Sequence, residues 1–275
     1  MIELLVVVSI ISLLSSIVLS SVNTAREKAR VAAGRSFSAQ AFRVAGDMAA
    51  GVWDFNEGSG NTAADRSGYG YNGTVTIGAS YSTDTYSGTG WSLSLNGTSG
   101  WVDVPYYPNL APVSGVSFGA WFKANNLSNN QRIISKTEGG GYHLSLNEGS
   151  GFCPGGAVLC ALVFAGGTYH GAVYPLSNLA QGKWHHAMAS YDGETLKLYV
   201  DGKEVASNTA PSGGVQYAVL NSLCIGTEAG SGTCTASSAF NGLVDEPRIF
   251  AKGLTASEVG KIYALEAPRF KLARE

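Results

Sequence analysis

Carboxylates and histidines are the side chains with which this chain could do chemistry, and a carboxylate pair would point to glycan hydrolysis. That reaction needs two acids about 5–9.5 Å apart in one cleft, which a strand supplies as Glu-x-Asp-x-Glu on one face. The sequence has no such pattern: Asp245 and Glu246 are adjacent and alternate in direction, and residues 201–204 form a predicted turn. His185 and His186 lack a Ser or Cys nucleophile with which to pair. We therefore expect no catalytic residues and no enzyme.

The four cysteines form two close pairs, Cys153 with Cys160 and Cys224 with Cys234, and each pair encloses a glycine-rich loop. An even number of cysteines in an exported domain indicates disulfides. Two local bonds are expected, each stabilising the fold by roughly 2–3 kcal/mol. Cross-pairing stays open from the sequence, whereas four-cysteine zinc binding is disfavoured because the spacings do not match a zinc ribbon.

One further carboxylate, Glu3, stands at the head of an apolar run that has no other charge before Arg26. A run of about 20 apolar residues can cross a bilayer as a helix. A carboxylate inside it costs roughly 2.5–3.5 kcal/mol, so a partner must offset that cost. A signal peptide would carry basic residues at this position, and a plain membrane anchor would explain the run but leave Glu3 unexplained.

The segment MIELLVVVSII at the start of the chain, followed by AREKAR at 25–30, resembles the N-terminus of a type IV pilin or a related pseudopilin. The resemblance implies processing by a prepilin peptidase, methylation of the new amino terminus, and pairing of Glu3 with the terminal ammonium of a neighbouring subunit. In low dielectric such an ammonium compensates the carboxylate and favours one stagger between helices. The implied assembly residues are Glu3, Leu4, Leu5, Val8 and Ile11.

The elements that position these residues follow from periodicity. Residues 1–50 are predicted to form one long α-helix, because residues 25–33 are good helix formers and apolar residues recur at helical spacing up to Met48. The first half would lie in the membrane and then in a filament core. The second half would lie against the rest of the protein.

Beyond residue 50 the chain becomes rich in Gly, Ser, Asn and aromatic residues, and segments such as 116–122 and 196–200 alternate between apolar and polar. This alternation, interrupted by Asn-Gly and Asp-Gly turns, predicts an antiparallel β-sandwich. A short C-terminal helix is expected over 255–265, with Thr255 as N-cap and Glu258 completing a capping box. The predicted fold class is α+β, a long N-terminal helix followed by a jelly-roll sandwich and this short helix.

The sandwich region resembles a laminin-G-like, concanavalin A-like jelly roll over roughly residues 51–265. The resemblance rests, in order along the chain, on residues 52–60, 64–74, 95–105, 184–202 and 241–250. It implies a lectin-like head with many functions among its relatives, so it predicts the fold better than the activity. The expected domains are a polymerisation and transmembrane helix at 1–50, the head at 51–266 and a tail at 267–275.

One structural calcium ion is the cofactor we expect. Calcium takes six to eight oxygen ligands, often from carboxylates and loop carbonyls. Glycine- and oxygen-rich loops carry Glu57, Asp65 and Asn72, and in similar jelly rolls such N-terminal loops meet the last strand, which here carries Asp245. The alternative is that Asp65 and Asn72 simply cap turns.

Aromatic side chains near the predicted loops could contact glycans, although most aromatics in such a sandwich belong to its core or rim. The candidates are Tyr81, Tyr86, Tyr106, Tyr107, Tyr169 and Tyr174.

The sequence thus predicts a pilin, a structural subunit of a type IV pilus-like extracellular filament, that polymerises with itself and displays an adhesive head. Its partners would be the assembly machinery, the prepilin peptidase, the inner membrane before assembly, and surface glycans. Alternatives are a minor tip adhesin, a secretion-system pseudopilin, or a membrane-anchored glycan-binding protein. The formal net charge of −2 and the lack of a basic patch argue against nucleic acid.

Overall fold

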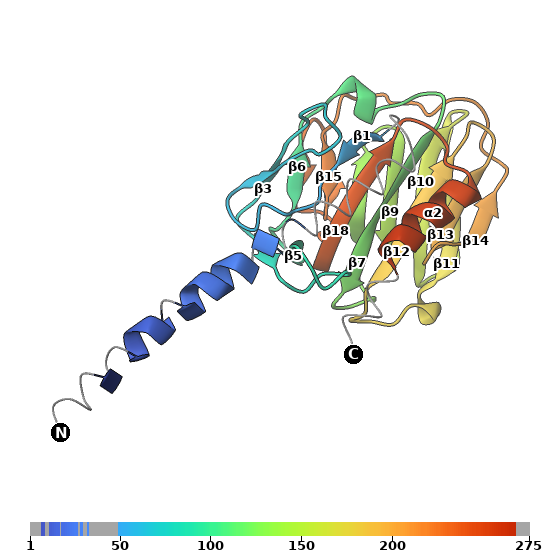
Figure 1. The fold of residues 1–275 in the computed structure, drawn as a ribbon. Helices are drawn as coiled ribbons and strands as arrows, with labels where there is room; N and C mark the ends of the chain where they lie inside the picture. Colours follow the sequence, from blue (N-terminus) through green and yellow to red (C-terminus); the bar gives the residue numbers. More distant parts are fainter. Residues whose placement is uncertain are drawn as a thin grey trace.

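Two antiparallel eight-stranded sheets, stacked face to face, make up most of the protein in the computed structural model (Figure 1). The structure describes residues 49–267 and, nearer the N-terminus, the helical residues 7–8, 11–16, 18–26, 28–29 and 32. Among these described residues, no helix is both long and apolar enough to cross a membrane.

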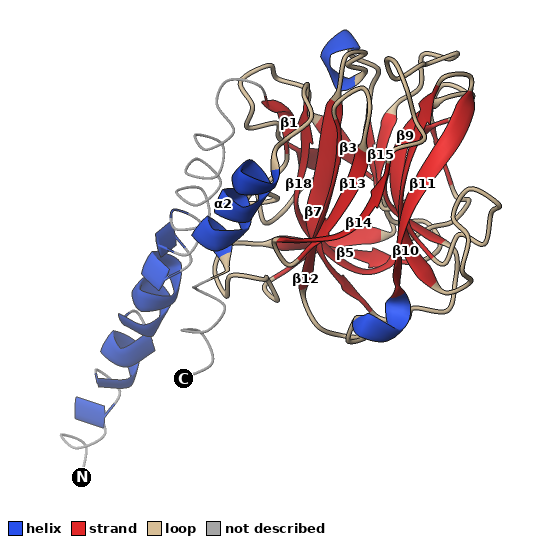
Figure 2. Ribbon diagram, turned by 90° about the vertical axis from the view of Figure 1, so that its right-hand side faces the viewer, coloured by secondary structure: helices blue, strands red, loops and turns tan. Residues whose placement is uncertain are grey.

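The first sheet, here called the helix-side sheet, runs in the order β14-β13-β12-β7-β18-β5-β4, and β1 also pairs with β18. Its strands are β1 (Ala49–Val52), β4 (Ala79–Ser82), β5 (Ser92–Asn96), β7 (Val116–Ala124), β12 (His185–Tyr191), β13 (Leu196–Val200), β14 (Lys203–Asn208) and β18 (Asn241–Phe250). The helix α2 (Ala256–Glu266) lies across its outer face (Figures 1 and 2).

The second sheet, here called the pocket-side sheet, runs in the order β11-β10-β9-β8-β15-β6-β3-β2. Its strands are β2 (Thr62–Ala63), β3 (Gly73–Val75), β6 (Val102–Val104), β8 (Gln131–Thr137), β9 (Gly141–Leu146), β10 (Val158–Ala165), β11 (Thr168–Pro175) and β15 (Leu223–Ile225). The remaining elements are a two-stranded ribbon of β16 (Glu228–Ala229) and β17 (Cys234–Thr235), and the 3₁₀ turns η2 (Pro108–Leu110) and η3 (Leu176–Asn178).

The core fills the space between the sheets with side chains that alternate along each strand, as period-two sequences dictate. Phe118 of β7 stacks on Tyr142 of β9 across this space, with ring centroids 4.7 Å apart. The buried Tyr142 hydroxyl donates a hydrogen bond to the Leu110 carbonyl at 2.9 Å, which satisfies its polar atom. Tyr142 and Leu144 therefore fix the inward face of β9, and the residue between them points outward.

The C-terminal helix begins as expected. Thr255 accepts a hydrogen bond from the Glu258 backbone N–H, and the Glu258 side chain accepts one from the Thr255 N–H, which completes the capping box. Val259 and Ile262 then pack the helix onto an apolar cluster that includes Phe250 of β18.

A buried charge network also joins α2 to the helix-side sheet. The Arg248 guanidinium donates to Glu266 of α2 at 2.6 Å and to Glu246 at 2.7 Å, and all three side chains are at most 3% exposed. The indole N–H of Trp121 donates to the same Glu266 at 2.5 Å. Glu246 has a left-handed φ of 49° where the β18–β7 register shifts, so the simple alternation that we expected for Asp245 and Glu246 does not hold there.

The prediction of one long helix over residues 1–50 is wrong. Ala49 and Ala50 begin strand β1, in which Ala49 pairs with Phe250 of β18 and is buried. Alanine is a good helix former, but pairing with the edge of β18 and burial against its apolar side chains override that local preference. The sandwich and the short C-terminal helix match the prediction. The division into segments 1–50, 51–266 and 267–275 stays a prediction.

The Arg248 network gives a stability prediction. Arg248→Met leaves Glu246 and Glu266 buried without their shared cation, so the free energy of unfolding should fall by about 3–5 kcal/mol. The matched control is Lys197→Met, which removes the cation of the half-exposed Lys197–Glu204 pair and should cost about 1 kcal/mol or less. Urea unfolding of both variants is the measurement, and equal losses would contradict the role of the buried network.

Candidate functional site

A cavity of about 340 Å³ lies on the outer face of the pocket-side sheet, and we call it the Glu148 pocket. Its lining comes from β8, β9, β10 and β11 and from two loops that fold over them. The lining residues are Arg132, Thr137, Glu138, Gly139, His143, Glu148, Ser150, Phe152, Leu162, Tyr169 and Glu228.

The alternation of β9 and a tight turn after it place the polar side chains of this pocket. Because Tyr142 and Leu144 face the core, His143 and Ser145 face outward. Asn147 then adopts a left-handed φ of 51°, a conformation that asparagine tolerates, and its N–H donates to the Val158 carbonyl at 2.7 Å. This turn carries Glu148 back over the outward-facing side chains of β9.

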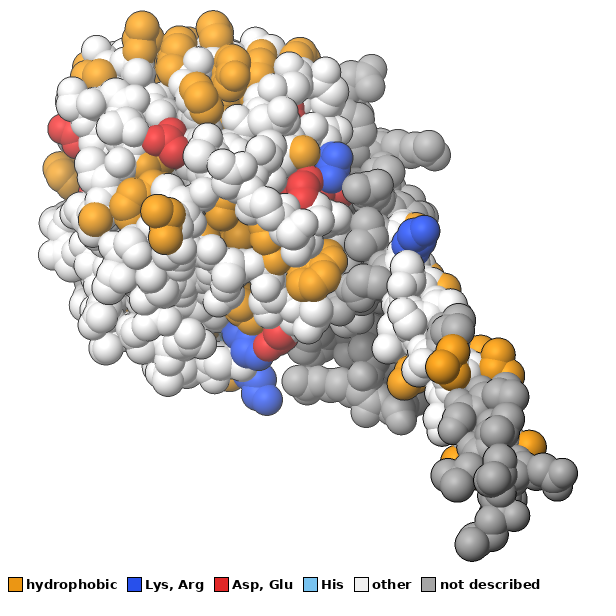
Figure 3. All heavy atoms as spheres, turned by 90° about the vertical axis from the view of Figure 1, so that its left-hand side faces the viewer, with side chains coloured by type: hydrophobic (Ala, Val, Ile, Leu, Met, Phe, Trp, Pro, Cys, Tyr) orange, Lys and Arg blue, Asp and Glu red, His pale blue; other side chains and the backbone are white. Residues whose placement is uncertain are grey.

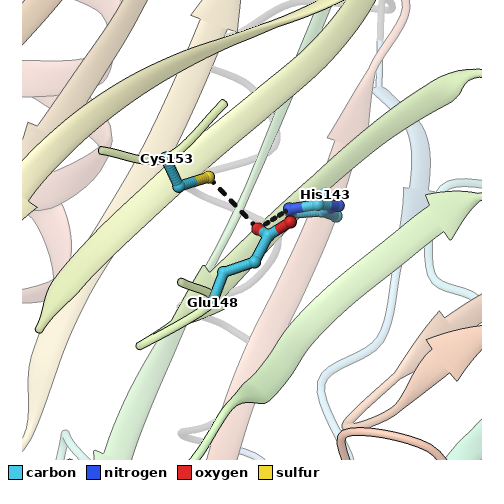
Figure 4. Close-up of side chains that lie close together, drawn as sticks. All are labelled: His143, Glu148 and Cys153. Carbon is cyan, nitrogen blue, oxygen red and sulfur yellow. Dashed lines mark hydrogen bonds and ion pairs between the residues drawn. The ribbon is translucent and has the colours of Figure 1, made fainter. Parts of the chain in front are cut away.

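Glu148 is the centre of the pocket, because one of its oxygens receives three polar contacts. His143 Nε2 lies 2.5 Å from Glu148 Oε2 (Figure 4). The Ser145 hydroxyl donates to the same oxygen at 2.9 Å, and Arg132 Nη1 lies 3.1 Å from it. A carboxylate only accepts, so Nε2 carries the hydrogen. The sulfur of Cys153 lies 3.2 Å from Oε2, but this sulfur is in a disulfide and has no hydrogen to donate.

Arg132 extends this cluster to the second loop. Its Nη2 donates to Glu228 of β16 at 3.1 Å, while the hydroxyls of Ser237 and Ser238 donate to the other Glu228 oxygen at 3.2 and 3.3 Å. The Arg132 side chain is 6% exposed, so the pairing with two carboxylates compensates a nearly buried charge.

The charges of the cluster are set by its neighbours. Burial alone would raise the pKa of the Glu148 carboxyl, but the hydrogen bond from His143 and the positive charge of Arg132 outweigh burial and lower it to about 2. Burial, together with Arg132, lowers the pKa of His143 despite the opposing effect of Glu148. At neutral pH the pocket therefore contains an ionised Glu148 and a neutral imidazole.

Two disulfides tie down the loops that cover the pocket, and they join the cysteines that the sequence paired. Cys153 is bonded to Cys160 of β10, and Cys224 of β15 is bonded to Cys234 of β17. The first loop lies so close to β11 that a Cβ on Gly171 would come 2.0 Å from the Phe152 carbonyl oxygen. Glycine at 171 is thus required for the loop to pack onto the sheet.

Two polar atoms of the pocket-lining residues have no hydrogen-bond partner among the described residues. Arg132 Nε and Ser150 Oγ are buried without a hydrogen-bond partner. Phe152 beside them is 45% exposed, and its ring centroid lies 5.5 Å from that of Tyr169. The pocket thus presents a donor, a hydroxyl and an exposed aromatic ring to anything that enters it.

The arrangement does not activate a nucleophile within the described pocket. A serine nucleophile needs a base that accepts its proton, whereas Ser145 donates to Glu148 and the neutral His143 donates to the same carboxylate. His143, Glu148 and Cys153 form the sole described group of at least three ligand atoms within 4.8 Å of one another, but Cys153 is disulfide-bonded and cannot ligate as a thiolate.

The predicted calcium ligands lie elsewhere, in the N-terminal loops and β18. Both oxygens of Asp65 accept hydrogen bonds, from the N–H groups of Val52, Ser67 and Tyr71 and from the Ser67 hydroxyl, and Asn72 Oδ1 accepts from the Asp65 N–H. In these contacts Asp65 and Asn72 cap a turn, as the alternative to calcium binding predicts. A calcium ion would have to displace them to bind Asp65.

The other two predicted calcium ligands are Glu57 and Asp245, and neither has its full set of oxygens ready for a metal ion. Glu57 Oε1 pairs with Arg66 at 2.6 Å, and Glu57 Oε2 is buried without a partner. Burial, with the charges of Glu246 and Asp54, raises the pKa of Asp245 well above its ordinary value. Calcium therefore stays a prediction, with Glu57 Oε2 the most available of the predicted atoms.

Of the predicted assembly residues, Glu3, Leu4 and Leu5 lie outside the described residues. Val8 and Ile11 are described, and they are 54% and 57% exposed on the N-terminal helix.

Sequence reasoning missed most of the Glu148 pocket. Of the aromatic candidates, Tyr169 lines it, but Phe152, Arg132, His143 and Glu148 were not singled out. The sequence contains part of the information needed to find them. His143 and Ser145 are the polar residues of the alternating pattern of β9, and Glu148 and Cys153 follow closely. What the sequence could not supply was the pairing that brings Arg132 and Glu228 to the same place.

A second hollow, about 660 Å³ and more open, lies beside β3, near the β2 edge of the pocket-side sheet. Figure 3 shows that side of the molecule, with scattered hydrophobic side chains and few charged ones. The fully exposed Ile77 and the half-buried Trp101 are among its lining residues, none of which is ionisable. It offers fewer groups for recognition than the Glu148 pocket.

A family model described as the concanavalin A-like lectin/glucanases superfamily matches residues 96–260. Among solved structures, domain 4 of AbnA, a GH43 extracellular arabinanase from Geobacillus stearothermophilus, in complex with arabinotriose, is 21% identical with a TM-score of 0.59. That match covers 78% of this chain and 98% of the domain. The comparison with curated protein sequences found no significant match.

Two toxin domains have the same fold. The binding domain of Paraclostridial Mosquitocidal Protein 1 is 15% identical with a TM-score of 0.60, covering 80% of this chain and 52% of that one. The ligand binding domain of botulinum neurotoxin serotype D, in complex with N-acetylneuraminic acid, is 18% identical with a TM-score of 0.57, covering 79% and 51%. The chain thus spans about half the length of these toxin domains, and the likenesses show that it shares their fold.

The depressed pKa of Glu148 predicts a pH dependence of stability. The pKa is about 4.5 when the chain is unfolded and about 2 when folded, so the stabilisation from its charge is complete above pH 4.5 and is lost as pH falls towards 2. The difference in unfolding free energy between the wild type and Glu148→Gln should therefore shrink from pH 7 to pH 2, by an amount on the order of 2–3 kcal/mol.

The control for this measurement is Glu204→Gln, which removes a half-exposed carboxylate. Because water screens that partly exposed ion pair, Glu204→Gln should cost about 1 kcal/mol or less throughout the measurement. A Glu148→Gln difference that is the same at pH 7 and pH 2 would contradict the assigned charge state.

Proposed function

The chain belongs to the concanavalin A-like lectin/glucanases superfamily, and on this premise we propose that it binds carbohydrate in the Glu148 pocket without transforming it. The observation that carries this proposal is the set of unpartnered polar atoms, Arg132 Nε and Ser150 Oγ, beside the exposed ring of Phe152. Saturated sugars present hydroxyl groups in the ring plane and apolar C–H groups on the ring face, which suits such a mixed surface.

The polar part of the pocket suits sugar hydroxyls in detail. Arg132 Nε can only donate and Ser150 Oγ can do both, whereas a carboxylate oxygen only accepts. Glu148 uses Oε2 for all its contacts with His143, Ser145 and Arg132, so Oε1 is left to accept a hydroxyl hydrogen. A donor, an acceptor and a hydroxyl within one cavity match neighbouring hydroxyls of a sugar ring, each of which donates and accepts.

The aromatic part supports the same reading. Phe152 projects from the disulfide-tied loop and packs at an angle of 56° to Tyr169 behind it. A ring held from behind on a tied loop loses little conformational freedom when a ligand packs against it, and that lowers the cost of binding. The solved arabinanase domain holds arabinotriose and the neurotoxin domain holds N-acetylneuraminic acid, so this fold accommodates sugars.

A binding role is favoured over hydrolysis because two of the three carboxylates that line the pocket, Glu148 and Glu228, are committed to ion pairs. Glu148 and Glu228 are both bonded to Arg132, and the lowered pKa of Glu148, about 2, keeps that carboxylate ionised and unable to act as a general acid. No residue is assigned to catalysis.

The binding proposal predicts the effect of removing the aromatic ring. Phe152→Ala should weaken binding of a neutral oligosaccharide such as arabinotriose about tenfold or more, because the apolar sugar face loses its platform. The matched control is Tyr69→Ala, which removes another half-exposed ring outside the pocket and should leave the affinity unchanged. Titration calorimetry of a panel of neutral oligosaccharides is the measurement; absence of binding to all of them, or equal effects of the two variants, would reject the site.

A second proposal concerns display of this head, and it rests on the described part of the N-terminal helix. Its described apolar side chains are 39–64% exposed, and some are visible on the face of the helix seen in Figure 3. They are Val7, Val8, Ile11, Leu13, Leu14, Val18, Leu19 and Val22. The hydroxyls of Ser12, Ser16 and Ser21 donate to carbonyls of the helix itself, so they add little polarity to its surface.

Apolar side chains left exposed along a helix need an apolar partner. We therefore propose that this helix assembles with copies of itself into a pilus-like extracellular filament, after residence in the inner membrane and processing by a prepilin peptidase. The pilus assembly machinery would be a further partner. Three arrangements compete with this one: a minor tip adhesin, a secretion-system pseudopilin, and a membrane-anchored glycan-binding protein.

The filament proposal predicts the behaviour of Glu3→Ala. Loss of the carboxylate removes the group that would pair with a neighbouring terminal ammonium, so filaments sheared from cells should contain at least about tenfold less protein, while the amount in the membrane fraction stays the same. Glu27→Ala, which removes the next carboxylate along the chain, is the control. Equal amounts of filament from wild type and Glu3→Ala would favour simple anchoring.

A further inference from the structure

We infer that the Glu148 pocket selects glycans by charge, binding sugars that carry an amine most tightly, neutral sugars next and sugars that carry a carboxylate least. This inference rests on the proposed function, because it concerns the class of sugar that the same pocket accepts. It sets this chain apart from the solved neurotoxin domain, which holds the anionic N-acetylneuraminic acid.

The charges that line the pocket are unequal. Arg132 is the only cation among its described lining residues, whereas Glu138, Glu148 and Glu228 are all carboxylates, so the lining formally carries two more negative charges than positive ones. His143 adds no positive charge at neutral pH, since burial and Arg132 lower its pKa. A sugar carboxylate would therefore enter a region of like charge, which disfavours it.

The one cation is also not free to receive an anion. Recognition of a carboxylate by arginine uses two parallel N–H donors. The Nη1 and Nη2 groups of Arg132 already contact Glu148, Asn130 and Glu228, which leaves Nε alone without a partner. A single N–H suits a hydroxyl oxygen, and a bound carboxylate would have to displace Glu148 or Glu228 from a buried ion pair.

The carboxylates, by contrast, keep capacity for a cation. Glu138 is exposed at the end of β8, and its side chain makes no ion pair with any described residue. Glu228 is 27% exposed, and Glu148 retains Oε1. An ammonium has three donors and no acceptor, so a sugar amine fits these oxygens better than a hydroxyl does.

The experiment compares sugars that share one ring and differ in a single substituent, which is neutral, an amine or a carboxylate. Glucose, galactose and mannose are each tested with the full chain as the neutral sugar, the 2-amino sugar and the uronic acid, by NMR titration at about 20 mM salt, where the Debye length is roughly 20 Å. In every series that binds, the uronic acid should bind at least about tenfold more weakly than the neutral sugar, and the amino sugar more tightly. In about 0.5 M salt these affinity ratios should move closer to one, because salt screens the charges.

Two variants connect the preference to the pocket. Glu138→Gln removes an exposed charge without breaking a buried pair, so the protein should fold normally, and the ratio of neutral to uronic acid affinity should fall about threefold. Glu194→Gln, which removes an exposed carboxylate on the turn after β12 that does not line the pocket, should leave the ratio unchanged.

The outcomes separate the two levels of the proposal. A uronic acid that binds as tightly as its neutral sugar, or a ratio unaffected by Glu138→Gln, overturns the charge selection while carbohydrate binding stands. If none of the nine sugars and no neutral oligosaccharide binds, the proposed function fails, and the charge selection fails with it.

Discussion

The architecture of the pocket depends on the need to pair one nearly buried guanidinium. Arg132 lies on a strand whose outer face is covered by loops, so its charge must be compensated within the protein. Glu148 comes from the loop after β9 and Glu228 from the ribbon that follows β15, and Arg132 bonds to both. A single side chain thus fixes two loops that are far apart in the sequence. The cavity is the space that remains between them.

The same solution occurs on the other outer face of the sandwich. There Arg248 joins Glu246 of β18 to Glu266 of α2, and the helix packs on the sheet through Val259 and Ile262. Each sheet is therefore closed on its outside by an arginine that bridges two carboxylates. The two faces differ in what covers the arginine. A helix seals one face with apolar side chains, whereas loops on the other face leave polar atoms such as Arg132 Nε and Ser150 Oγ without partners.

Sequence reasoning succeeded where the signal is local. Alternation and turn dipeptides predicted the sandwich, short spacings predicted both disulfides, and the Thr255–Glu258 capping box marked the start of α2. It failed where a distant partner decides the outcome. Ala49 and Ala50 have helical preferences, but pairing with the end of β18, about 200 residues later, makes them a strand. The pairing of Arg132 with Glu228 depends likewise on long-range packing, which no local pattern encodes.

The disulfide between Cys153 and Cys160 has a consequence for how this surface can change during evolution. The bond attaches the loop to β10 covalently, and residues 154–157, which it encloses ahead of the strand, are exposed. Substitutions at the loop tip, including the ring at Phe152 just before it, are therefore buffered from the stability of the domain. Such a modular tip can acquire new ligand preferences while the scaffold beneath it is inherited unchanged.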